Sequence, residues 1–146
     1  MLDTDDLVHD DLQQVCRYHG GFLPEPKDVS ENRFLDNLGT ETFALGMTDV
    51  EVEGEWVWDS EGSPVTWVRW SEYNSEPSGG TNNNCALMLR YMFFFEEGYS
   101  SDGWRAYRCP SHSFFRNKPR SLICQRNSGK YIIDCIIAYI ARENSL

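Results

Sequence analysis

"EWVWDSEGSPVTWVRW", residues 55–70, holds four of the five tryptophans in the chain. Trp56 and Trp58 alternate with other residues before the turn-forming residues 61–64, and two further tryptophans follow that turn. Large apolar side chains that alternate on both sides of a turn containing Gly and Pro are typical of two antiparallel strands with one buried face. The stretch therefore predicts two strands whose indole rings belong to the core of the domain.

The composition limits the classes of partner. The chain has 146 residues, enough for one domain with its own core, and a formal net charge of -10. This excess of negative charge disfavours nucleic acids and anionic membranes as partners. No apolar run reaches the roughly 20 residues that span a bilayer, so we expect no membrane span. The acidic N-terminus is unlike a signal peptide, so a secreted form of this protein would need a leader that this chain lacks.

Two helices are expected before the tryptophan-rich stretch. Residues 5–19 and 31–38 have apolar side chains at helical spacing, and we expect Ser30 to cap the second helix and Phe34 to face inward. Segments that favour strands are "TFALGM" (42–47), "CALMLRYMFFF" (85–95), "WRAYRC" (104–109) and "SLICQR" (121–126). Two helices followed by many strands predict the α+β class with antiparallel sheets.

The order of these segments resembles the C-type lectin-like domain from residue 5 to residue 126. The resemblance is carried by "GGFLPEP" after Cys16, "ALGMTD" at the family's W-I-G-L strand, Glu76-Pro77 at its E-P-N motif, Trp104 five residues before Cys109 as in W-N-D-x-x-C, and "LICQ" at its closing strand. It implies a C-type lectin-like fold, with two helices flanking antiparallel sheets and a long loop region. It also implies a recognition module that is not an enzyme.

The resemblance implies a pairing for four of the five cysteines. It joins Cys16 to Cys124 and Cys85 to Cys109, which ties the first helix to the closing strand and closes the binding loop. Disulfides of this kind indicate an oxidising compartment and hence a secreted, extracellular protein. Cys135 is left without a family partner.

The same residues permit a second interpretation as a metal site. Cys16-x-x-His19 and Cys109-x-x-His112 are two C-x-x-H pairs, which together could supply Cys₂His₂ ligands to zinc. The two interpretations exclude each other because each uses the same two cysteines.

The loop "SEPSGGTNNNC", residues 75–85, stands where lectins of this family hold calcium and sugar. Position by position, Glu76 keeps the first carboxylate, Ser78 replaces an Asn and Asn83 replaces a Glu. Arg105-Ala106 replaces the Asn-Asp pair that follows the tryptophan. Calcium requires about 6–8 oxygens, several of them charged. We therefore expect no calcium cofactor here, and a pairing of Arg105 with Glu76 instead.

The expected ligand-binding residues are Glu76, Ser78, Asn83, Trp104, Arg105 and Tyr107. Trp104 has an alternative role in the core. Asp49 and Glu53 match two ligands of a second calcium position in some family members, and are exposed turn residues in the alternative interpretation. The leading hypothesis is a module that binds a protein or glycan ligand without calcium in the usual site. The alternatives are a calcium-dependent carbohydrate-binding lectin with altered ligands, and a structural or matrix protein that assembles into oligomers.

Residues 127–146 extend beyond the family's closing strand, whereas the strand that usually precedes the first helix is missing from this chain. Residues 131–140, "YIIDCIIAYI", are rich in β-branched and aromatic residues. We expect them to fold back beside 121–126 and take the place of the missing strand, covering an open sheet edge. The alternative is a helix, because the isoleucines also recur at helical spacing. An oligomer could then form through this segment or through Cys135.

Overall fold

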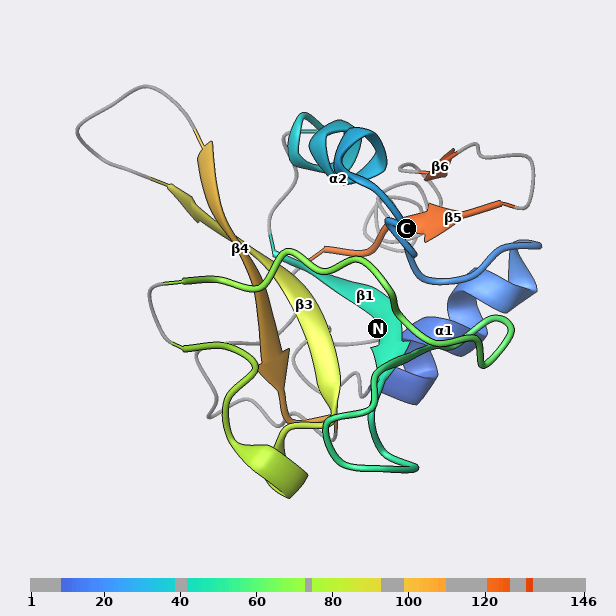
Figure 1. The fold of residues 1–146 in the computed structure, drawn as a ribbon. Coiled ribbons are helices and arrows are strands. Elements are labelled where there is room, and N and C mark those ends of the chain that lie inside the picture. The colour runs from blue at the N-terminus through green and yellow to red at the C-terminus, as the bar shows by residue number, and fades with distance from the viewer. Residues whose placement is uncertain are drawn as a thin grey trace, which may run out of the picture.

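The structure, a computed structural model, describes residues 9–38, 42–72, 75–92, 99–109, 121–126 and 131–132. Its elements are α1 (His9–Tyr18), α2 (Val29–Asp36), β1 (Phe43–Thr48), β2 (Val57–Trp58), the short 3₁₀-helix η2 (Gly80–Asn82), β3 (Cys85–Met92), β4 (Tyr99–Tyr107), β5 (Cys124–Gln125) and β6 (Tyr131–Ile132). One antiparallel sheet has the order β2-β1-β3-β4, and β5 pairs with β6 (Figure 1). The predicted α+β class is confirmed.

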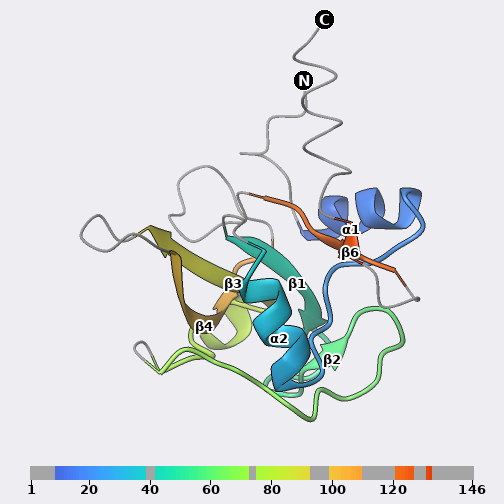
Figure 2. The ribbon, with the colours of Figure 1, turned by 90° about the horizontal axis from the view of Figure 1, so that it is seen from above.

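The two helices lie on different sides of β1 (Figure 2). Leu12 and Cys16 are buried on the inner face of α1, where they pack with Ala44 of β1 and with Cys124 of β5. Two acidic residues stand in the first turn of α1 and one basic residue in its last turn, which suits the helix dipole. Within the described residues, neither helix is long and apolar enough to cross a bilayer.

The second helix begins earlier than the sequence suggested. Asp28 is the N-cap, and its carboxylate accepts from the backbone N–H of Glu31 at 2.8 Å. The Glu31 carboxylate in turn accepts from the backbone N–H of Lys27 at 2.6 Å, which completes a capping box. The prediction of Ser30 as the cap is therefore wrong. A carboxylate caps a helix as well as a hydroxyl does, and the one at Asp28 is backed by Glu31.

The face of α2 that points inward also differs from the expectation. Asn32 and Leu35 are buried, whereas Phe34 is 50% exposed, so the prediction that Phe34 faces inward is wrong. Residues three apart share a helix face, and the buried Asn32 fixes that face because its Oδ1 accepts from the indole Nε1–H of Trp104 at 2.8 Å.

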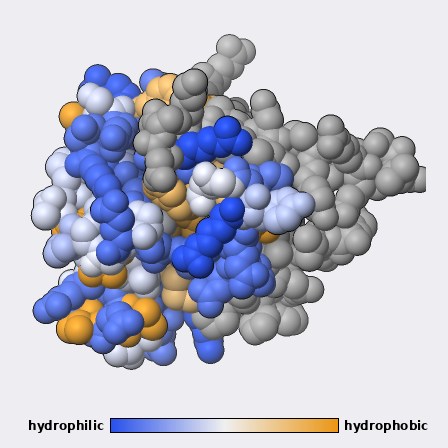
Figure 3. All heavy atoms as spheres, turned by 90° about the vertical axis from the view of Figure 1, so that its right-hand side faces the viewer, coloured by the Kyte–Doolittle hydropathy of each residue, from blue (hydrophilic) through white to orange (hydrophobic). Residues whose placement is uncertain are grey.

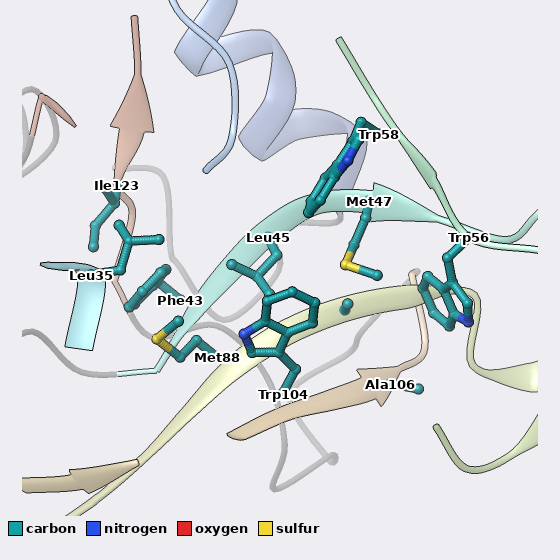
Figure 4. Close-up of a cluster of buried hydrophobic side chains, with 11 residues drawn as sticks. Leu35, Phe43, Leu45, Met47, Trp56, Trp58, Met88, Trp104, Ala106 and Ile123 are labelled. Carbon is teal, nitrogen blue, oxygen red and sulfur yellow. The ribbon is translucent and has the colours of Figure 1, made fainter. Parts of the chain in front are cut away.

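Trp104 of β4 is fully buried in the main core (Figure 4). Its ring meets those of Trp67 and Trp70 edge-on, with centroids 5.7 and 5.9 Å apart, and that of Trp58 at 6.5 Å. Edge-to-face packing of this kind stabilises aromatic clusters beyond simple burial. The other buried members of the cluster are Leu35, Phe43, Leu45, Met47, Trp56, Ala86, Met88, Ala106 and Ile123.

The tryptophan-rich stretch forms one regular strand rather than the two that its pattern predicts. Two backbone hydrogen bonds, from Trp58 N–H to Ser63 O and from Val65 N–H to Trp56 O, close the expected turn. After the turn the chain is irregular, and it bonds to the backbone of Trp104 instead of continuing the pairing with β2. The prediction of a second strand is therefore wrong, although all four indole rings do lie against or within the core.

Two disulfides join distant parts of the fold. Cys16–Cys124 connects α1 to β5 with a Cα–Cα distance of 5.3 Å. Cys85–Cys109 connects the first residue of β3 to a residue just after the end of β4, with a Cα–Cα distance of 5.2 Å. This is the pairing that the family resemblance implies. The zinc interpretation is wrong, because its two cysteines are both oxidised into disulfides.

The start of the C-terminal extension pairs with the closing strand. Ile132 lies opposite Cys124, and Tyr131 lies opposite Gln125, in an antiparallel arrangement. The remainder of the extension, residues 133–146, lies outside the described residues, and so does Cys135. The role of 131–140 as a replacement strand or as a helix therefore stays a prediction.

Glu25 is a buried carboxylate between two buried prolines, and it holds the turn that follows β2. The backbone N–H and the hydroxyl of Ser60 both donate to it, at 2.9 and 2.7 Å. Removal from water dominates over these hydrogen bonds and raises the pKa of Glu25 above its ordinary value of 4.5. The charged form is thus less stable in the folded protein than in the unfolded chain.

We expect Asn32→Ala to lower the free energy of unfolding by about 1–3 kcal/mol, because the buried indole N–H of Trp104 then lacks an acceptor. Urea denaturation followed by tryptophan fluorescence measures this change. The control is Arg33→Ala on the exposed face of the same helix, for which the change should stay within about 0.5 kcal/mol. Equal losses in the two variants would contradict a specific role for the Asn32–Trp104 hydrogen bond.

We expect Glu25 to make the protein less stable as pH rises. Because its pKa is raised in the folded state, the folded protein binds more protons than the unfolded chain between pH 4.5 and the higher folded value. The difference in unfolding free energy between wild type and Glu25→Gln should therefore favour the wild type more at pH 4.5 than at pH 7. Denaturant titrations at both pH values measure it, with the exposed Glu55→Gln as the charge-matched control. A pH-independent difference would contradict the prediction.

Candidate functional site

The candidate site is the loop that leads from Ser75 into β3. Gly79 adopts a positive φ of 88° at the start of η2. The side-chain amide of Asn83 then donates back to the carbonyl of Ser78 at 3.1 Å, and that of Asn84 donates to the carbonyl of Thr81 at 3.2 Å. The run of asparagines therefore closes this loop on itself through side-chain to backbone hydrogen bonds.

Glu76 is the centre of the hydrogen-bond network in the loop, and its side chain is only 4% exposed. One carboxylate oxygen accepts from the backbone N–H groups of Ser78 and Ala106, at 2.9 and 3.0 Å. The other accepts from the Ser78 hydroxyl at 3.0 Å, and the Nε of Arg105 lies 3.9 Å from it. The expected pairing of Arg105 with Glu76 is therefore present. Three donors and one cation from the protein itself surround this carboxylate.

The residues around Glu76 do not fit a calcium ion. Calcium needs about 6–8 oxygen ligands, several of them charged. Here the single carboxylate is already bonded, the Ser78 hydroxyl donates its proton to that carboxylate, and Ala106 has no side-chain oxygen. The Arg105 guanidinium adds a positive charge that would repel a divalent cation. Across the described ranges, no three His, Cys, Asp or Glu side chains group in a way that could hold a metal.

Four of the six predicted ligand-binding residues meet in this loop, and two do not. Glu76, Ser78, Asn83 and Arg105 are brought together as expected. Trp104 is buried in the core, and Tyr107 is 3% exposed. This burial corrects the prediction that their side chains contact a ligand. Successive residues of β4 point to opposite faces. Trp104 is buried in the tryptophan cluster, and Tyr107 packs with Leu87 and Leu89 and contacts His9 of α1.

Tyr107 is held by a buried histidine of α1. Its hydroxyl lies 3.0 Å from Nδ1 of His9, and Nε2 of His9 donates to Asp59 at 3.0 Å. Burial, and then the negative charges of Asp59 and Asp10, raise the pKa of the Tyr107 hydroxyl. This chain of contacts joins α1, the turn after β2 and the end of β4.

Asp49 and Glu53 lie beside the loop, in the turn between β1 and β2. One Asp49 oxygen accepts from the backbone N–H of Gly54 at 2.9 Å, and the other is buried without a hydrogen-bond partner. Partial desolvation, and then the charge of Asp49, raise the pKa of the exposed Glu53. The backbone carbonyl of Asn84 accepts from Asp49 N–H at 3.2 Å, and the Asn84 side-chain oxygen is also buried without a partner. Asp49 of the predicted pair is therefore in contact with Asn84.

Sequence reasoning also missed the backbone N–H of Ala106. Ala106 drew attention only as a lost oxygen ligand, yet its amide is one of the three donors to Glu76. No residue type signals such a donor, because every residue except proline has one. Only the pairing of β3 with β4, in which Ala86 lies opposite Ala106, shows where this N–H points.

Two helices, a four-stranded antiparallel sheet, a loop closed beside β3 and two disulfides define a domain of the C-type lectin class. Residues 7–130 match the family model described as "Lectin C-type domain", so the chain belongs to this family. It is a C-type lectin-like recognition domain. The fold that the sequence resemblance implied is confirmed.

Two curated relatives show the extent of the likeness. The chain is 33% identical over 76 residues to pulmonary surfactant-associated protein D of Bos taurus, which covers 50% of this chain and 20% of that protein. It is 32% identical over 106 residues to tetranectin of Homo sapiens, which covers 68% of this chain and 48% of that protein. The chain thus spans less than half the length of either relative.

Solved structures share the fold at lower identity. The carbohydrate-recognition domain of the mouse scavenger receptor C-type lectin is 23% identical with a TM-score of 0.56, over 70% of this chain and 75% of that one. A calcium-independent type II antifreeze protein is 21% identical with a TM-score of 0.58, over 71% and 72% of the two chains. At these identities the likeness shows the fold alone.

We expect Gly79→Ala to disrupt the loop. An added Cβ would collide with the Asn83 side chain, and the positive φ would strain any residue other than glycine. Gly54→Ala is a matched control, because Gly54 has a similar φ of +82° and open space around its Cα. Gly54→Ala should cost about 1–2 kcal/mol of stability, and Gly79→Ala clearly more. Amide hydrogen exchange of residues 76–84 should rise only in Gly79→Ala. Equal behaviour of the two variants would contradict a role for the Asn83 contact.

Proposed function

We propose that this domain is an extracellular recognition module that binds a protein or glycan ligand at the Glu76 loop without calcium bound to Glu76. The observation that carries the proposal is the saturation of the Glu76 carboxylate by Ser78, Ala106 and Arg105. A carboxylate that accepts three hydrogen bonds and lies beside a guanidinium has little capacity left for a metal ion. The loop is thus held in shape by the protein's own donors.

The surface next to this loop supports direct recognition. Pro77, Thr81 and Asn82 are exposed, and Arg105 stands at the edge of the network with its Nε free of a close hydrogen-bond partner. The exposed hydroxyl of Thr81 and amide of Asn82 are suited to hydrogen bonds with a glycan or with a protein surface, whereas the Arg105 side chain is only 12% exposed. The two disulfides support an oxidising, extracellular setting.

A calcium-dependent function with altered ligands is the second candidate, and a specific observation favours it at a different position. Asp49 and Asn84 each have a buried side-chain oxygen without a partner, and Glu53 stands near them. Buried oxygens of this kind are costly unless something binds them. A cation bound between these residues would occupy the second calcium position of some family members. It would not contact Glu76.

Calcium titration calorimetry separates the two candidates. Under the leading proposal, calcium does not bind to Glu76. The calorimetric titration of Glu76→Gln with calcium is therefore the same as that of the wild type. If the second candidate holds, the wild type binds calcium and Asp49→Asn abolishes this binding. Calcium binding that is lost in Glu76→Gln and kept in Asp49→Asn would overturn the leading proposal. Glycan-array and protein-ligand binding with and without a chelator then report whether recognition itself needs the ion.

Restoring the family's oxygen ligands should create the calcium site that the present residues lack. We expect the combined substitutions Ser78→Asn, Asn83→Glu, Arg105→Asn and Ala106→Asp to give calcium binding with a dissociation constant of roughly 10⁻⁴–10⁻³ M, as in extracellular modules. Arg105→Asn alone is the control, since it removes the cation and adds only one oxygen. Failure of the fourfold variant to bind calcium, with its fold intact by circular dichroism, would show that these four positions do not decide calcium affinity.

A further inference from the structure

A pocket lies on the side of the molecule that carries α1, away from the Glu76 loop. It has a volume of about 300 Å³ and lies between Gln13 and Arg17 of α1, Phe22, and the turn Asp59–Glu61. The described surface on this side is mostly hydrophilic (Figure 3). A pocket of this volume is at the lower end of small-molecule sites, so it suits a ligand of a few heavy atoms.

The floor of the pocket is a fixed carboxylate. The Asp59 side chain is 9% exposed, and one of its oxygens accepts from Nε2 of the buried His9 at 3.0 Å. Among the described residues, the structure shows no hydrogen bond to the other oxygen. The next residue, Ser60, is held by two hydrogen bonds to the buried Glu25. The Asp59 carboxylate is therefore held in one position, and its second oxygen can accept a hydrogen bond from a ligand in the pocket.

Opposite charges line the pocket without neutralising each other. The guanidinium of Arg17 has one hydrogen bond, to the Gln13 side chain at 3.4 Å, and the structure shows it in no ion pair with Asp59 or Glu61 among the residues it describes. The Glu61 carboxylate is exposed and likewise has no partner there. The cation and the two carboxylates therefore stand more than an ion-pair distance apart, and a ligand with both charges could contact both.

We propose that this pocket binds a small zwitterion of the α-amino-acid class. The ligand's ammonium group meets the free oxygen of Asp59 and the carboxylate of Glu61, and its carboxylate meets the guanidinium of Arg17. The half-buried ring of Phe22 gives an apolar contact for the carbon atoms between these groups. Such a site is independent of recognition at the Glu76 loop, because the two lie on different parts of the fold.

Chemical-shift titration of the ¹⁵N-labelled chain with L-alanine tests the proposal. We expect saturable shifts of the amides of Gly21, Phe22, Ser60 and Glu61. Arg17→Gln and Glu61→Gln should each weaken binding by about fivefold or more, the effect of losing one exposed charge contact of roughly 1 kcal/mol. Acetate and methylammonium, which each carry one of the two charges, should bind more weakly than L-alanine by a similar factor.

The controls are Arg33→Gln and Glu51→Gln, which remove the same charges from exposed positions elsewhere on the surface. Both should bind L-alanine like the wild type. The proposal is overturned if L-alanine gives no saturable shifts at the pocket, or if either pocket variant binds as well as its control. Equal binding of acetate or methylammonium alone would also overturn it, because the site would then recognise a single charge.

Discussion

The buried indole of Trp104 is the constraint on which the rest of the described fold depends. Its Nε1–H must find an acceptor away from water, and Asn32 supplies one at 2.8 Å. The hydrogen bond sets the inner face of α2. The Trp104 ring packs edge-on against Trp58, Trp67 and Trp70. The backbone of Trp104 also bonds to Arg69 and Ser71, which holds the long loop region against β4. One residue thus positions a helix, a loop and a strand.

The candidate site follows directly from that position. Arg105 and Ala106 come next along β4, and the register of the strand directs the Ala106 N–H and the Arg105 side chain to Glu76. Because Trp104 is fixed by the core, these two groups are fixed as well. A loop whose only carboxylate is satisfied in this way has no electrostatic requirement for a cation in order to fold. Its shape is a consequence of the core and of the loop's own hydrogen bonds.

Local patterns in the sequence were enough for the main elements and for the position of the loop. Apolar runs marked β1 and β3, the segment 104–109 marked the second half of β4, and the order of the motifs indicated the family. The sequence was less informative where the outcome depends on contacts far along the chain. Asp28 capped α2 in place of Ser30, Phe34 faced outward, and the second half of the tryptophan-rich stretch followed Trp104 instead of β2. Each of these depends on a partner that no local pattern specifies.

The same distinction explains why the loop could be located from sequence while its chemistry could not. Glu76, Ser78 and Asn83 are visible as residue types, and the loss of oxygen ligands could be counted from them. What replaces the missing ligands is a backbone N–H and a guanidinium from another strand, together with a hydroxyl that serves as donor. Substitution of ligands at a metal site leaves a carboxylate that still needs partners, since a buried charge without them is costly. A chain that keeps Glu76 after losing the other oxygens must therefore supply donors from its own loop and neighbouring strand, and the hydrogen bonds of Ser78 and Ala106 are that supply.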